Sequence, residues 1–229
     1  MEMMSEFEVV KKFVTKDKET FELAELVFKN FVEIKDAMAA EKLKELADDI
    51  EKAIGEIDEF GQDWIVKNDL DNITGRRQRD VLMIGKRYWF QQDYHFHIFL
   101  SFDQKDCQGC YIGVCGNFEY VKDPFNKLSI DRKFSGAKEV PDGFKFGRIS
   151  NESVVFYIFH EYTNKELYKN LFFYEEHDNI SKNIIDRITE LIRILEIKNN
   201  GLLTEANRDL TKLFAPNDTP IDNTLDEKQ

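Results

Sequence analysis

The sequence predicts an α+β fold with an N-terminal helical segment, an antiparallel sheet of about five strands, and a C-terminal helix packed on one sheet face. Apolar residues recur at helical spacing in the first 60 residues and again after residue 180, and they alternate at strand spacing between these parts. The predicted strands follow one another without intervening helices. This order favours an antiparallel meander over a parallel sheet.

The first third of the chain is typical of helix. A first apolar stripe has spacings of four, three and four, at Val27, Phe31, Ile34 and Met38. A second stripe alternates spacings of three and four, at Leu43, Leu46, Ile50, Ala53, Ile57 and Phe60. The step between the stripes is five, so the segment is either a helical hairpin or one long helix whose apolar face rotates. No Gly or Pro interrupts it there, and Gly61 is the predicted stop.

From about residue 81 the period changes from helical to strand-like. In residues 94–102 every even position is apolar, whereas His95, His97 and Ser101 lie among the odd ones. This strand and a second one at 110–115, joined by turn residues 103–109, predict an antiparallel hairpin. The remaining candidate strands are residues 81–90, 144–149 and 154–159.

The last part of the chain is predicted to return to helix. Thr163 and Glu166 form a capping box for a short helix through residue 170, and residues 171–174 are a candidate short strand. A strong helical stripe then runs from Ile180 to Leu195 and is expected to stop at Asn199-Asn200-Gly201. A weaker helix follows, with apolar residues at Leu203, Ala206, Leu210 and Leu213.

These patterns divide the chain into three parts. Residues 1–66 are predicted to form a helical segment, residues 67–214 an antiparallel α+β domain, and residues 215–229 a disordered acidic tail. Between Ala215 and the end of the chain there are two prolines, four acidic residues and almost no apolar ones, too little apolar surface for a packed core.

Composition bounds the function. The chain has 229 residues and a formal net charge of -12, so it is expected to repel nucleic-acid backbones and anionic lipids. No apolar run approaches the roughly 20 residues of a membrane span, and the acidic N-terminus is followed by no apolar signal segment. Three cysteines are a sparse, odd number. They favour a reducing cytosol, so we predict a cytoplasmic protein.

One motif has the residue types of a zinc site, namely His95, His97, Cys107 and Cys110. Two histidines two residues apart on a strand point to the same side, and Cys-x-x-Cys in the following turn could close on one ion. The alternative is that the histidines are solvated or satisfied by amides and that the thiols are incidental. We favour this alternative, and we predict neither a metal nor another cofactor.

A basic island stands out in the acidic chain, at Arg76, Arg77, Arg79, Lys86 and Arg87. Arginines on an exposed turn can bind phosphates or carboxylates with two hydrogen bonds each, so these residues are the candidate ligand-binding surface. The alternative is that they neutralise acidic residues of the N-terminal helices, at Asp48, Asp49, Glu51, Glu56, Asp58 and Glu59.

No catalytic constellation is recognisable, so the chain is not expected to be an enzyme. The acid-x-Lys tripeptides of metal-dependent nucleases occur at Glu33-Ile34-Lys35 and Glu196-Ile197-Lys198, but both lie in helical stripes instead of strands. The nucleophile elbow, the phosphate-binding loop and the dinucleotide-binding glycine motif are absent.

The order of helix, Trp89, alternating strand, Tyr111-Ile112-Gly113-Val114, Phe156-Tyr157-Ile158-Phe159 and closing helix carries one resemblance. Residues 40–196 resemble the C-terminal, non-catalytic half of bacterial and phage proteins of the PD-(D/E)XK nuclease superfamily. The resemblance implies an accessory or recognition module in nucleic-acid conflict. The catalytic strands of those relatives have no counterpart in this sequence, which puts nuclease activity in doubt.

The leading hypothesis is a non-enzymatic, acidic binding module that acts on a protein partner with a basic surface, as inhibitors, immunity proteins and accessory subunits do. One alternative is a metal-dependent nucleic-acid-processing protein or its accessory subunit, with a site assembled from His95, His97 and His160. The other is a structural subunit, a homo-oligomer that self-associates through its N-terminal helices.

Overall fold

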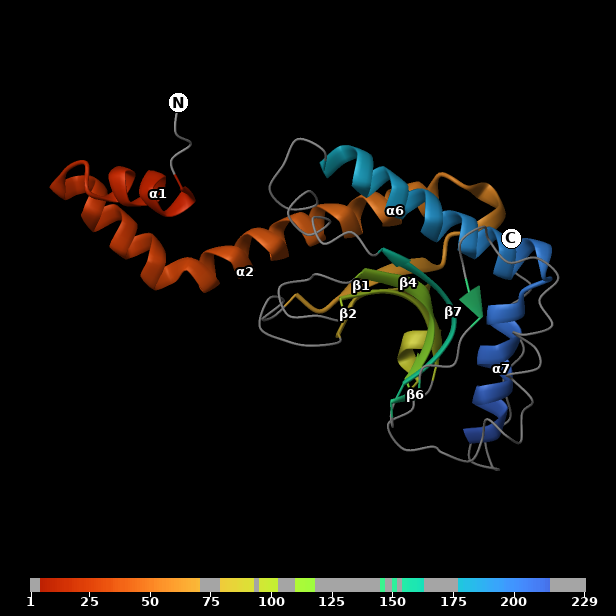
Figure 1. Ribbon diagram of the computed structural model, residues 1–229. Helices are drawn as coiled ribbons and strands as arrows, with labels where there is room; N and C mark the ends of the chain where they lie inside the picture. The colour runs from red at the N-terminus through yellow and green to blue at the C-terminus, as the bar shows by residue number, and fades with distance from the viewer. Residues whose placement is uncertain are drawn as a thin grey trace.

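The computed structural model describes residues 5–70, 79–92, 95–102, 110–117, 145–146, 150–151, 154–162 and 177–214. It confirms the predicted α+β class, with N-terminal helices, an antiparallel sheet and C-terminal helices (Figure 1). The chain begins with helices α1 (Glu6–Val14) and α2 (Lys18–Gly55). It ends with helix α6 (His177–Ile192), π-helix η4 (Arg193–Lys198) and helix α7 (Leu202–Phe214).

All strand pairs of the sheet are antiparallel, in the order β1-β2-β3-β4-β7-β5, with β6 also paired to β7. The longer strands are β1 (Trp64–Asn68), β2 (Arg79–Lys86), β3 (Phe96–Phe102), β4 (Cys110–Asn117) and β7 (Val154–Tyr162). Two-residue strands β5 (Lys145–Phe146) and β6 (Ser150–Asn151) line the β7 edge. The predicted hairpin of β3 and β4 is therefore confirmed, and β1 to β4 form the predicted meander, whereas β7 lies between β4 and β5.

Helix α2 decides between the hairpin and the single helix that the sequence left open. It is one helix of 38 residues, and it continues through the step of five between Met38 and Leu43. The helix is continuous there because no Gly or Pro interrupts its backbone hydrogen bonds, and the step of five rotates its apolar face. The helix ends at Gly55, and Gly61, with φ 78, follows the short 3-10 helix η1 (Asp58–Phe60).

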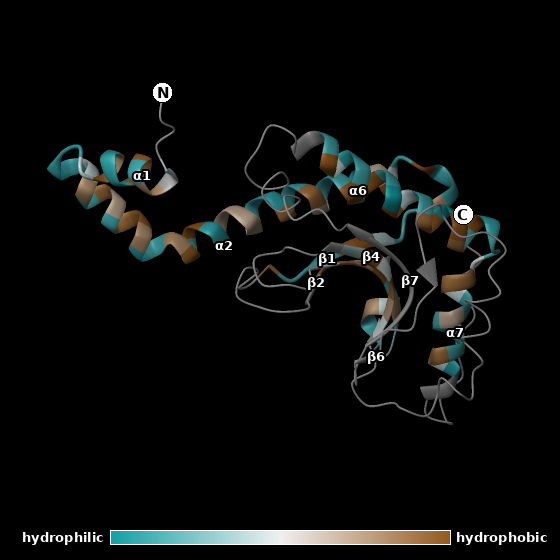
Figure 2. Ribbon diagram, in the orientation of Figure 1, coloured by the Kyte–Doolittle hydropathy of each residue, from teal (hydrophilic) through white to brown (hydrophobic). Residues whose placement is uncertain are grey.

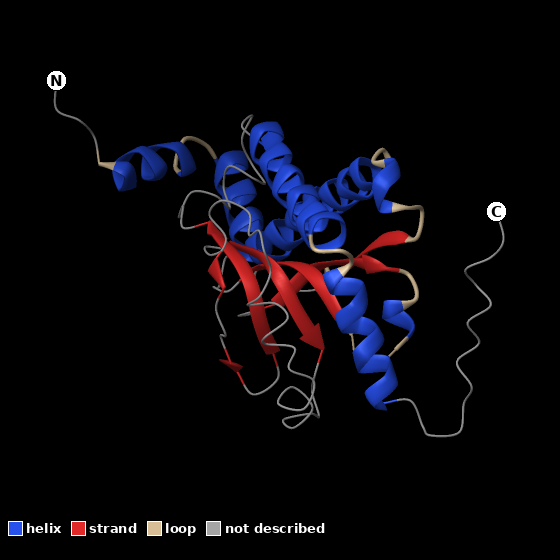
Figure 3. Cartoon of the chain, turned by 90° about the vertical axis from the view of Figure 1, so that its right-hand side faces the viewer, coloured by secondary structure: helices blue, strands red, loops and turns tan. Residues whose placement is uncertain are grey.

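One face of the sheet packs against the second half of α2, α6 and α7 (Figure 3). The strand register places one row of apolar residues across this face, at Val66, Ile84, Ile98 and Val114. Opposite them lie fully buried helix residues that include Leu46 and Ile188. Each such side chain contributes about 2 kcal/mol through removal of apolar area from water. The domain boundary predicted after residue 66 falls inside β1, and this core draws residues from both sides of it.

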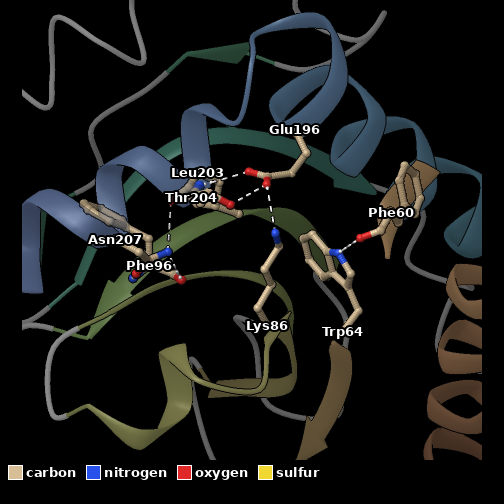
Figure 4. Close-up of polar contacts among 8 residues, drawn as sticks. All are labelled: Phe60, Trp64, Lys86, Phe96, Glu196, Leu203, Thr204 and Asn207. Carbon is tan, nitrogen blue, oxygen red and sulfur yellow. Dashed lines mark hydrogen bonds and ion pairs between the residues drawn. The ribbon is translucent and has the colours of Figure 1, made fainter. Parts of the chain in front are cut away.

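The C-terminal helices are joined at the predicted left-handed stop. Asn200 and Gly201 have φ values of 53 and 77, and the Gly201 N–H donates to the Glu196 carbonyl over 2.8 Å. The Glu196 carboxylate caps α7 by accepting from the Thr204 backbone N–H over 3.0 Å and from the Thr204 hydroxyl (Figure 4). A negative charge is favourable at this helix N-terminus. The acid-x-Lys tripeptide at Glu196 is thus helical and structural.

Two further polar contacts fasten the elements that surround the core (Figure 4). The buried Asn207 side chain of α7 accepts from the Phe96 N–H over 2.7 Å and donates to the Phe96 carbonyl over 3.1 Å. The Trp64 indole N–H donates to the Phe60 carbonyl over 2.9 Å, and its ring meets Trp89 edge-on. These contacts satisfy polar groups that burial would otherwise leave without partners.

Several predicted elements differ from the structure or lie outside the described residues. Strand β1 was not predicted, and the end of the predicted strand at 81–90 is instead a 3-10 helix, η2 (Trp89–Gln91). Of the strand predicted at 144–149, only Lys145–Phe146 is described, as β5, whereas Ser150–Asn151, outside the predicted strands, forms β6. The short helix through residue 170, the strand at 171–174 and the tail at 215–229 lie outside the described residues.

Candidate interaction surface

Residues 5–38 form an arm that projects from the rest of the molecule (Figure 1). The arm consists of α1 and the first part of α2, and it points away from the sheet. The burial of α2 changes along its length. Its buried residues begin at Ala39, and every one of them lies between Ala39 and Ile54. The same helix is therefore a core element in its second half and a protruding one in its first.

The turn between α1 and α2 is set by caps on both helices. The Thr15 N–H and hydroxyl donate to the Lys11 carbonyl at the end of α1. Two residues later, the Asp17 carboxylate accepts from the Thr20 N–H over 2.7 Å and caps α2. These hydrogen bonds from Thr20 lower the pKa of Asp17. A well-capped, short turn holds the two helices of the arm as a hairpin.

Hydrophobic residues recur along the arm (Figure 2), and many of their side chains are exposed. Among the described residues, 15 large apolar side chains are exposed, and all but Tyr88 and Ile197 belong to the arm. The thirteen in the arm are Phe7, Val9, Val10, Phe13, Phe21, Leu23, Leu26, Val27, Phe28, Phe31, Val32, Ile34 and Met38. Phe28 is 86% exposed. Clusters of this kind mark interaction sites, whereas single exposed apolar residues are ordinary.

The arm carries more apolar surface than one helix stripe provides. The predicted stripe of Val27, Phe31, Ile34 and Met38 is only one part of it. A second set, Phe21, Phe28 and Val32, has spacings of seven and four and reaches the buried Ala39 after another seven residues. Residues at these spacings share a helix face, so the core-facing side of α2 continues outward without a covering layer. This second set was not predicted from the sequence.

Beyond the arm, α2 and η1 carry an acidic ridge, residues 41–59. It contains eight Asp and Glu against three Lys, hence a net charge of -5, and all eight acidic side chains are exposed. The ridge includes all six acidic residues that the basic island was predicted, as an alternative to ligand binding, to neutralise. A ridge of this charge attracts basic surfaces over a distance of about one Debye length, roughly 8–10 Å.

The structure separates the members of the predicted basic island. Arg79 lies at the start of β2 and Lys86 at its end, about 23 Å apart at the usual strand rise. The Lys86 ammonium pairs with the Glu196 carboxylate over 3.8 Å, where both side chains are largely buried. Lys86 therefore neutralises the cap of α7. Arg87 is exposed, Arg76 and Arg77 lie outside the described residues, and ligand binding by the island stays a prediction.

Two of the four candidate zinc ligands, His97 and Cys110, lie far apart in the sheet. Cys110 is paired with Phe102, five residues and about 16 Å along β3 from His97. Ligands of one zinc ion lie about 2.0–2.3 Å from it, so His97 and Cys110 cannot share an ion. Cys107 lies outside the described residues. The residue opposite His97 is Cys115, whose Sγ is 3.0 Å from His97 Nε2. Among the described residues, no group of three or more His, Cys, Asp or Glu is arranged to hold a metal.

The histidines lie instead in a buried cluster on the second sheet face. His95 Nδ1 is 3.1 Å from the Gln92 carbonyl, to which it must donate because a carbonyl only accepts. The Phe90 ring of η2 lies edge-on to the His95 ring. Gly85 allows η2 to approach β2 closely, because a Cβ at this position would lie 2.8 Å from the Trp89 ring. Burial, then the neighbouring His97, lower the pKa of His95 to about 4.

This lowered pKa predicts a loss of stability in mild acid. The unfolded chain takes up a proton at His95 near pH 6.5, but the folded protein does so only near pH 4. The free energy of unfolding should therefore fall between these pH values, by at most about 3 kcal/mol from this group. Denaturant titrations from pH 7 to 4 measure it. His95→Asn, which keeps a donor for the Gln92 carbonyl, should reduce the change in the free energy of unfolding between pH 7 and 4. If this variant loses as much stability in acid as the wild type, His95 is not the group responsible.

A membrane-spanning helix is not found among the residues that the structure describes. Comparison with known proteins adds no relative: no family model, no curated protein and no solved structure matches this chain.

Proposed function

We propose that this protein is a non-catalytic binding module that acts on a protein partner through its N-terminal arm. One observation carries the proposal. Thirteen large apolar side chains are exposed on one protruding helical hairpin, whereas only Tyr88 and Ile197 are large, apolar and exposed among the other residues that the structure describes. Apolar surface of this extent gains free energy when a second protein covers it.

The charge of the chain bears on the kind of partner. The acidic ridge continues along the same helix as the arm, so a partner that reaches beyond the arm meets exposed carboxylates. Such a surface favours a basic partner by speeding association and rejecting acidic competitors. Three cysteines favour a partner in the cytoplasm, and the resemblance to PD-(D/E)XK proteins implies a role in bacterial or phage conflict.

The test is affinity capture from an extract of the native cells. The bait is the full-length chain, compared with an arm variant that carries Phe28→Glu and Phe31→Glu. These positions are exposed, so the variant should fold like the wild type. Ile197→Glu is the matched control, because Ile197 is a large apolar residue that is exposed, at 40%, and lies outside the arm.

The proposal expects a defined protein to be captured by the wild type and the control and at least tenfold less by the arm variant. Raising the salt from 50 to 500 mM should weaken capture further if basic residues of the partner contact the ridge. If all three baits recover the same proteins in the same amounts, the arm is not the binding surface.

A further inference from the structure

We propose that the occupant of the arm is the arm of a second copy of this chain, so that two helical hairpins pair about a two-fold axis. The inference rests on the proposed function, because both assign binding to the arm. It goes further by naming what covers the apolar side chains, namely the second copy. The acting unit is then a dimer that presents two acidic ridges to the partner, and an arm variant loses capture because it loses the dimer.

The distribution of charge favours a second copy. The arm contains eight acidic residues and six lysines, a net charge of -2, whereas the rest of the chain carries the remaining -10. Acidic residues and lysines are interspersed along it, as in the pair of Lys18 and Glu22, whose charged groups are 3.4 Å apart. Two such arms repel each other little. A surface built for a strongly basic partner would carry the acidic excess, which lies in the ridge.

The apolar area matches what a stable dimer needs. Five phenylalanines of the arm, Phe7, Phe13, Phe21, Phe28 and Phe31, are each more than half exposed. At roughly 200 Å² per ring side chain, these exposed fractions amount to about 650 Å². The eight aliphatic and methionine side chains bring the total to about 1,200 Å², above the roughly 800 Å² that each partner buries in a standard interface.

Helix α1 supplies a second argument. It has nine residues, and isolated helices shorter than about 12–15 residues are marginal in water. Packing on α2 still leaves Phe7, Val10 and Phe13 more than half exposed. A second arm laid against this hairpin would cover these side chains and those of α2 in one four-helix layer, which stabilises α1 in the conformation observed.

The shape of the molecule permits the pairing. From Lys18 to Met38 α2 spans 21 residues, a path of about 30 Å at the usual helical rise, and it carries the arm clear of the sheet (Figure 1). Two arms can therefore meet without collision of the folded domains. A two-fold arrangement uses the same patch on both copies, so the pairing closes at two chains. A membrane surface fits less well, because interfacial helices are rich in Lys and Arg and the arm is weakly acidic.

Sedimentation equilibrium of the full-length chain between 0.5 and 100 μM tests the inference. The wild type and the Ile197→Glu control should sediment as dimers of the 27.1 kDa chain, with a dissociation constant in the low micromolar range or below. The arm variant Phe28→Glu/Phe31→Glu should raise that constant at least 100-fold, with unchanged far-ultraviolet circular dichroism. Leu26→Glu, a second arm variant, guards against a local effect of the first pair and should also weaken association.

Two results would overturn the inference. One is a wild-type chain that stays monomeric at 100 μM, and the other is an arm variant that dimerises as tightly as the wild type. A monomeric chain that pellets with phosphatidylserine vesicles would assign the arm to a membrane. If the wild type is monomeric and the arm variant still loses capture of a cellular protein, only the self-association is wrong, and the proposed function stands.

Discussion

Replacing Asn207 with alanine is expected to lower the free energy of unfolding by about 3 kcal/mol. The Asn207 side chain is buried and bonds both the N–H and the carbonyl of Phe96, at the start of β3. Alanine would remove both of these buried hydrogen bonds, and with them the link between α7 and the start of β3. Guanidinium titration followed by the fluorescence of Trp64 and Trp89 measures the change.

Asn30→Ala is the matched control for this substitution. Asn30 and Asn207 both lie in helices, and each donates to the carbonyl four residues earlier, Leu26 and Leu203 respectively. Only Asn207 also reaches the sheet. The control should therefore be neutral or slightly stabilising, because alanine has the higher helix propensity. Equal effects of the two substitutions would show that the contacts with Phe96 contribute nothing.

Leu46→Ala is expected to cost about 3 kcal/mol of stability, and Leu26→Ala less than about 0.5 kcal/mol. Both residues are leucines of α2, so the change in helix propensity is the same. Leu46 is fully buried in the core, whereas Leu26 is 58% exposed in the arm. Only the first substitution leaves a cavity. Both are best made with Phe28→Glu/Phe31→Glu present, so that association does not contribute.

The comparison measures how sharply α2 divides into a core half and an arm. Denaturant titration of the two variants at one protein concentration is sufficient. Comparable losses of stability at Leu26 and Leu46 would mean that the arm packs against the folded domain in solution, and the projecting arm described here would then be wrong.

Much of the fold could be predicted from the sequence, because alternating and helical apolar patterns are local. The β3–β4 hairpin and the stop at Asn200-Gly201 follow from side chains close together in the chain. Strand β1 could not be predicted in this way. It is five residues long, and its burial falls from the buried Trp64 to two exposed residues at its end, so it lacks the alternation that marks a strand. The step of five between the two stripes of α2 permitted both a hairpin and one helix, and the absence of Gly and Pro agrees with the single helix observed.

The candidate binding and metal-ligating residues were harder to predict, because residues close together in the sequence can lie at opposite ends of a strand. Arg79 and Lys86 look like one basic cluster, but a strand of eight residues holds them at opposite ends. His97 and Cys110 look like zinc ligands, but the register brings Cys115 to His97 instead. The exposed apolar residues of the arm could have been predicted from the sequence. Phe21, Phe28 and Val32 form a second apolar set in addition to the first stripe, whereas a helix that packs on one core needs a single stripe.

Hydroxyl-radical labelling of Phe28 tests whether a second protein chain covers the apolar side chains of the arm. Phe28 is 86% exposed, and Tyr88, 42% exposed and outside the arm, serves as the internal reference. We expect the labelling of Phe28 relative to Tyr88 to fall several-fold as the purified chain is concentrated from 0.5 to 100 μM, or on addition of native cell extract. A ratio that stays constant under both conditions would contradict the account.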